Sequence, residues 1–142
     1  MIGMTMAALA MASAAPERIG QPMLDGKPLP FSEAVRVGDT LYLSGQIGRT
    51  PGGMLPEGIE AQARQTMDNI ASSLAKAGAG WSDVVKCTVM LDEMKDWPAF
   101  NAVYVTYFRD GQFPARSAFG ADGLALGALV EVECIAVKPQ GK

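Results

Sequence analysis

The most constraining stretch of the sequence runs from Phe113 to Val137 and reads FPARSAFGADGLALGALVEVECIAV. Pro114 fixes its own φ and favours an extended residue before it, so Arg116 should leave the preceding loop on a strand. After a glycine-rich turn comes a long apolar strand that carries Glu131 and Glu133. Burial of a carboxylate in such a strand is costly unless it has a charged or hydrogen-bonding partner. The nearest candidate partner is Arg116, on the preceding strand.

Strand alternation divides residues 129–137 between two faces. One face holds the two glutamates together with Leu129, Ile135 and Val137, and the other holds Val130, Val132, Cys134 and Ala136. Two interpretations of the charges stay open. The glutamates could lie on a solvated face with Arg116 as a surface cation or salt-bridge partner, because most charges on strands are solvated. Alternatively, they belong to a ligand site.

Composition limits the function classes. A chain of 142 residues with 49% hydrophobic content fits one globular domain with a sizeable core. Twelve basic against fifteen acidic residues give a net charge of -3, without a basic block, so no nucleic-acid partner is expected. The sequence has no histidine, which excludes Ser-His-Asp and Cys-His nucleophile systems and histidine-ligated zinc. We expect no metal site.

The cysteines and the N-terminus bear on the cellular compartment. Cys87 and Cys134 lie in apolar strand patterns, where reduced buried thiols are the default and a single disulfide stays open. Residues 1–15 are apolar and form a possible signal-like or disordered segment, which includes a signal-peptidase-like Ala12-Ser13-Ala14 but lacks a basic residue. We therefore predict a cytoplasmic protein, with export to the periplasm as the alternative if residues 1–14 act as a signal peptide. This segment is too short to span a membrane as a helix.

The order of the periodic segments predicts the fold class. Residues 16–30 are rich in Pro and Gly and are expected to form a loop or arm. Two strands are then expected at residues 33–37 and 40–46, followed by a helix at 59–77 that ends before Gly78. A strand at 84–91 and a helix from Asp96 to Phe108 come next, before the last two strands. This order predicts an α+β fold in which two helices cover one face of the sheet. The other face is expected to pack against another copy of the chain.

Several stretches of the sequence, in order and spacing, resemble the reactive intermediate deaminase A (RidA, also called YjgF) family. The similar stretches are PFSEAVRVGDTLYLSGQIG at residues 30–48, EAQARQTMDNI at 60–70, WSDVVKCTVML at 81–91, FNAVYVTYF at 100–108, and FPARSAFG followed by ALVEVECIAV. The resemblance implies a chorismate-mutase-like (YjgF-type) fold with a mixed sheet, assembled as a homotrimer with clefts between subunits. It covers residues 30–142 as a single RidA-like domain, preceded by an N-terminal arm at residues 1–29.

The resemblance also implies an activity and a set of site residues. The expected reaction is hydrolysis of reactive enamines and imines, from 2-imino acids to 2-oxo acids and ammonia, without a cofactor. Arg116 would bind the substrate carboxylate, and Glu131 would order or activate the attacking water. Further cleft residues are implied at Phe31, Gly45, Asn101 and Ala118. Glu133 could raise the pKa of Glu131 by like-charge repulsion or bond to a neighbouring subunit.

The sequence departs from the family pattern at Phe31, where the family's deaminases usually carry Tyr and so a hydroxyl group. The loop at residues 120–127 is glycine-rich where the family often has a Leu-Pro turn. These departures keep a second hypothesis open, a non-enzymatic ligand-binding or chaperone-like trimer. An endoribonuclease is less favoured, because the net charge is negative and histidine is absent.

Overall fold

The computed structural model describes residues 15–141. The signal-like segment discussed above, residues 1–14, lies outside these. In the described part of the chain, no helix is both long and apolar enough to cross a membrane.

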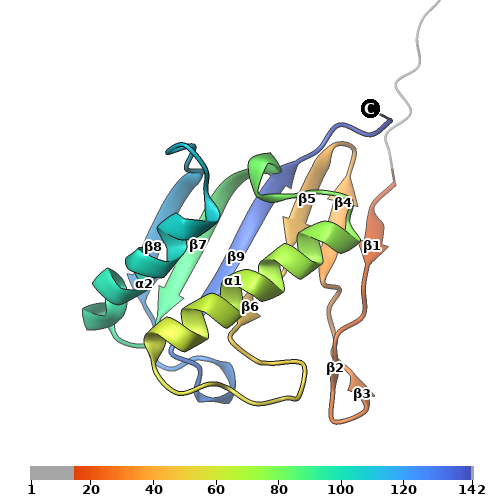
Figure 1. Cartoon of the computed structure of the whole chain (residues 1–142). Coiled ribbons are helices and arrows are strands. Elements are labelled where there is room, and N and C mark those ends of the chain that lie inside the picture. Colours follow the sequence, from red (N-terminus) through yellow and green to blue (C-terminus); the bar gives the residue numbers. More distant parts are fainter. Residues whose placement is uncertain (1–14, 142) are drawn as a thin grey trace, which may run out of the picture.

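Two helices and a mixed sheet make up the fold (Figure 1). In chain order the elements are β1 (Glu17–Ile19), β2 (Met23–Leu24), β3 (Lys27–Pro28), β4 (Ala34–Val37), β5 (Thr40–Leu43), β6 (Gln46–Ile47), α1 (Ile59–Lys76), β7 (Val84–Leu91), α2 (Trp97–Tyr104), β8 (Ala115–Gly120) and β9 (Val130–Val137). Short 3-10 turns occupy Trp81–Asp83, Met94–Asp96, Val105–Tyr107 and Ala125–Gly127. The strands pair in the order β1-β4-β5-β9-β7-β8, and β6 also pairs with β9. The pairs in this sheet are antiparallel except β7 with β8, so the predicted mixed α+β sheet with both helices on one face is confirmed.

The core lies between the sheet and the helices. The two faces of β9 that strand alternation predicted are present, and the face that carries Val130, Val132, Cys134 and Ala136 is the buried one. Helix α1 buries its stripe of Ala63, Met67, Ile70 and Leu74 against the sheet. Full burial of an aliphatic side chain is worth roughly 1.5–3 kcal/mol, so this layer holds the sheet in place. The chain leaves α1 through Gly78, whose φ of +72° suits the predicted glycine at the C-terminus.

The second helix differs slightly from its prediction. Asp96 precedes α2, but its side chain makes no capping hydrogen bond. The regular helix ends at Tyr104, and a 3-10 turn continues to Tyr107. Pro98 is tolerated because it lies in the first turn, where its missing N–H has no helical partner.

Residues 16–30 contain strands where a loop or arm was expected. β1 pairs with β4 at the edge of the main sheet, and β2 with β3 forms a separate hairpin. Asp25 and Gly26 both have positive φ, at 50° and 75°, as a two-residue hairpin turn requires. The Asp-Gly pair was a readable signal for this hairpin. β1 has no strong pattern of its own because it is only three residues long and mostly exposed. The predicted division of the chain between residues 29 and 30 stays a prediction.

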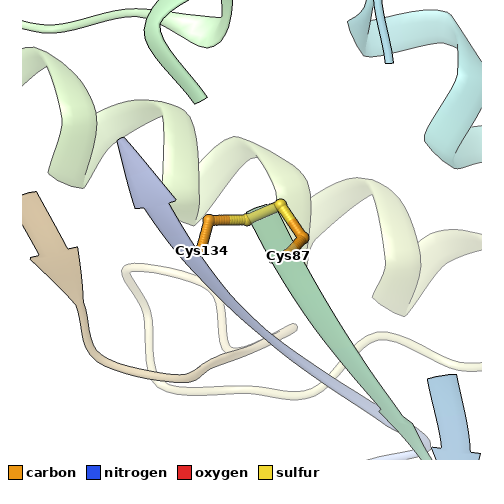
Figure 2. Close-up of a disulfide and its surroundings, with 2 residues drawn as sticks. All are labelled: Cys87 and Cys134. Atoms are coloured by element: carbon orange, nitrogen blue, oxygen red, sulfur yellow. A yellow bond between two sulfur atoms is a disulfide. The ribbon is translucent and has the colours of Figure 1, made fainter. Parts of the chain in front are cut away.

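Cys87 and Cys134 form a disulfide, so the default of reduced thiols was wrong (Figure 2). The two residues are register partners on the adjacent strands β7 and β9, with Cα atoms 4.1 Å apart. Both point to the helix-covered face and are buried. The pairing depends on the register of two strands far apart in sequence, which the two separate strand patterns could not reveal.

Candidate functional site

The six site residues expected from the sequence fall into two groups. Arg116 and Asn101 contact each other between β8 and α2, and Ala118 lies farther along β8. Phe31, Gly45 and Glu131 line a pocket that includes no residue of that first group.

Arg116 lies against α2. Its Nη1 donates a hydrogen bond of 2.8 Å to Asn101 Oδ1. Its guanidinium carbon is 4.7 Å from the ring centroid of Tyr104 and 5.7 Å from that of Trp97, distances at which the ring faces attract a cation. Asn101, which the resemblance implied as a cleft residue, is thus a direct partner of Arg116. It orients the arginine from a neighbouring helix.

The aromatic partners of Arg116 were missed in the sequence. Trp97, Asn101 and Tyr104 are spaced four and three residues apart, which puts them on one face of α2. This spacing was a usable signal, but only strand pairing shows that Arg116 lies opposite it. Burial raises the pKa of the Tyr104 hydroxyl, and the charge of Arg116 opposes this effect. Tyr104 Oη has no hydrogen-bond partner among the described residues.

Arg116 forms no ion pair within residues 15–141. Its other guanidinium donors are not engaged by protein groups of that range, apart from the bond to Asn101. A guanidinium presents five N–H groups in a planar fork that matches a carboxylate. Arg116 is thus a positioned cation with donors available for an anionic ligand.

Glu131 lies in the other group, on the face of β9 opposite the core. It pairs in register with Ile47 of β6 and Met90 of β7. Its carboxylate lies directly over Gly45, where an added Cβ would overlap Oε1 and lie 3.0 Å from Cδ. Burial raises the pKa of the Glu131 carboxyl, and repulsion from Glu133 raises it further. The like-charge effect expected for Glu133 is therefore present, although burial is the larger cause.

The pocket that contains Glu131 has a volume of about 550 Å³. Phe31 and Gly45 line it next to the strands, and the polar flank of α1 contributes Asn69, Ser72, Ser73 and Lys76. The glycine-rich loop at residues 120–127 contributes Ala125 and Leu126. A further wall comes from the β2–β3 hairpin region, with Pro22, Met23, Leu24 and Leu29, which the sequence did not suggest.

Arg116, the nearest candidate partner for the glutamates in the sequence, does not pair with Glu131 within one chain. β8 follows the helix and turn in sequence, but it pairs with β7 and not with β9. Arg116 is the register partner of Cys87, which faces the helices, whereas Glu131 lies on the opposite face of β9. The two side chains are therefore separated by the sheet. Ala118, two residues after Arg116, packs half-buried against the core.

Metal ligation has no support in the described part of the chain. Residues 15–141 contain no cluster of three Asp, Glu or Cys side chains that could hold an ion.

Comparisons with known proteins agree with these features. The profile of the Endoribonuclease L-PSP family matches residues 27–138. The 2-iminobutanoate/2-iminopropanoate deaminase of Mus musculus is 42% identical over 111 residues, covering 77% of this chain and 82% of the relative. The crystal structure of the YjgF gene product from E. coli superposes with a TM-score of 0.77 at 34% identity, over 85% of this chain and 98% of that one. E. coli TdcF, solved with bound serine, has a TM-score of 0.75 at 29% identity, over 85% and 94%. The chain therefore belongs to the Endoribonuclease L-PSP family, the family of YjgF and RidA.

Proposed function

We propose that this protein is a cofactor-independent deaminase that hydrolyses 2-imino acids to 2-oxo acids and ammonia. The observation that carries the proposal is Arg116. Its guanidinium is held by Asn101 and by two aromatic rings, yet no acidic side chain of the described residues neutralises it. A positioned cation of this kind suits the carboxylate of an imino acid through two parallel, charge-assisted hydrogen bonds.

Glu131 is the proposed base. A water between its carboxylate and the substrate would attack the imine carbon, and Glu131 would take the proton released as the new C–O bond forms. That proton passes to the imine nitrogen, which gives a tetrahedral amino alcohol. Glu131 then transfers the hydroxyl proton to the nitrogen, and the C–N bond breaks as the C=O bond forms, so that ammonia leaves. The raised pKa of Glu131 favours this exchange, because a carboxyl that gains a proton more readily also holds it during the step. Positioning of the water adds to the effect.

The complete site is proposed to form between two copies of the chain. One chain holds Arg116 and Glu131 on opposite faces of its sheet, so a substrate that touches both needs the arginine of one subunit and the glutamate of the next. The open face of the sheet supports assembly. Its exposed apolar side chains include Val37, Tyr42, Phe119 and Val137. We propose the homotrimer of the family as the assembly, with Phe31, Gly45, Asn101 and Ala118 in the cleft.

The decisive test generates an imino acid in situ with an amino-acid oxidase and follows release of ammonia and 2-oxo acid, with semicarbazide as the trap for free imine. We expect the wild type to accelerate imine loss. Arg116→Ala should lower kcat/KM about 100-fold, the loss expected for about two charge-assisted hydrogen bonds. Arg109→Ala, an exposed arginine outside both groups, is the matched control and should retain full activity.

One observation favours a second function. Phe31 offers no hydroxyl at the pocket, so a trimer that binds carboxylate ligands without turnover is the alternative. If neither the wild type nor the control accelerates imine loss, the binding function takes precedence, and Phe31→Tyr tests whether one hydroxyl separates the two. RNA cleavage is disfavoured by the net charge of -3 and by the absence of histidine.

The compartment is a further proposal. The sequence favours the cytoplasm, with export as the alternative, and the Cys87–Cys134 disulfide now supports the alternative. Disulfides persist in oxidising compartments and are rare in the cytosol. Alkylation of free thiols in intact cells, followed by mass analysis of this protein, would distinguish the oxidised from the reduced form.

A further inference from the structure

The β2–β3 hairpin region forms an apolar wall of the pocket that contains Glu131. Pro22, Met23, Leu24 and Leu29 all line the pocket from this region. Hydrogen bonds hold the wall in place. Leu29 N donates to Pro22 O at 2.9 Å, and Arg49 Nη1, from the loop after β6, donates to Met23 O at 3.5 Å. The hairpin is thus attached to the pocket at its base and at β2.

A second apolar group lines the same pocket from the turn Ala125–Gly127. Leu126 has a φ of +57°, in the left-handed region that non-glycine residues seldom adopt. Such a conformation has an energetic cost and is found where the surrounding structure imposes it, often at ligand sites. Leu126 adopts this conformation although its side chain is 59% exposed. Packing in the core therefore does not account for its position.

Three large apolar side chains are exposed and line this one pocket. Met23 is 50% exposed, Phe31 44% and Leu126 59%. Exposed apolar groups gathered at a concave site mark a binding surface. The volume of about 550 Å³ is in the range of pockets that hold drug-sized ligands, and an imino acid of three or four carbons would fill only a small part of it.

We propose that Met23, Phe31 and Leu126 form a side-chain subsite, which makes this protein prefer imino acids with long or branched apolar side chains over the shortest ones. The inference rests on the proposed deaminase function and assigns its substrate class. The carboxylate and imine groups need only Arg116 and Glu131, which leaves the apolar walls to the substrate side chain. Each methylene moved from water to such walls favours binding about fourfold.

The test is a homologous series of imino acids formed in situ from alanine, 2-aminobutyrate, norvaline and norleucine. We expect kcat/KM to rise along the series, by about tenfold or more from the first to the last, after subtraction of the uncatalysed rate. Full burial of three extra carbons would give about 60-fold, and the partial exposure of the walls reduces this.

Met23→Ser should lower the norleucine-to-alanine ratio of kcat/KM at least threefold. Met54→Ser is the matched control, because Met54 is a 73% exposed methionine that does not line the pocket, and its ratio should equal that of the wild type. Leu126→Ala tests the opposite wall, so the result does not depend on the hairpin variant alone. A flat or falling series in the wild type, or an unchanged ratio in both wall variants, would overturn the subsite while the deaminase function stands. A protein that accelerates no imine would refute both.

Discussion

Gly45→Ala should disable the site by moving the carboxylate of Glu131. A Cβ at this position would lie 3.0 Å from Glu131 Cδ and 3.2 Å from Cγ, and would overlap Oε1. Carbon atoms in favourable contact are about 3.5–4.0 Å apart, so the carboxyl group has to move by roughly 0.5–1 Å. A displacement of about 1 Å at a reacting group can lower the rate about 100-fold, which corresponds to about 2.7 kcal/mol of transition-state stabilisation.

The expected result is a loss of about 100-fold in kcat for an in situ imine, with little change in the midpoint of thermal unfolding. Stability should be spared because the displaced atoms are at the flexible end of a side chain and Gly45 does not have a positive φ. Gly52→Ala is the control, since the nearest atom to its added Cβ is 3.8 Å away. When Glu131→Gln is already present, Gly45→Ala should lower kcat by less than a further threefold, because both substitutions act through the carboxylate of Glu131. A Gly45→Ala enzyme within threefold of wild-type kcat would refute this account of the site.

Two further predictions concern charge and covalent structure. Because Glu131 has to be ionised to act as a base and its pKa is raised, kcat/KM should fall as pH decreases, with a midpoint above that of an ordinary glutamate. Glu133→Gln should move this midpoint of the pH–rate profile to lower pH. The shift should be partial, because burial is the larger cause of the raised pKa of Glu131. An unmoved midpoint would contradict the repulsion between the two glutamates. The disulfide closes a separation of 47 residues, so its reduction, or Cys87→Ala with Cys134→Ala, should lower the free energy of unfolding by about 2–4 kcal/mol in denaturant titrations. Equal midpoints with and without reductant would show that the bridge adds no stability.

Local patterns in the sequence were sufficient to predict most of the helices and strands. Alternation along β9 correctly put Val132 and Glu131 on different faces, because successive side chains of any strand point to opposite sides, and the structure shows that the face of Val132 is the buried one. The spacing of apolar residues placed α1, and Gly78 marked its end. The resemblance carried by the motifs identified the family, which the comparisons confirm.

Tertiary structure alone decided how these elements meet. That β8 pairs in parallel with β7 depends on contacts between distant segments, and neither strand's own alternation encodes its neighbour. This pairing puts Arg116 against Trp97 and Tyr104 instead of Glu131. The register of β7 on β9 likewise determines that Cys87 and Cys134 form a disulfide. Sequence patterns report which face of an element is apolar, whereas strand order and register follow from packing the whole chain around one core.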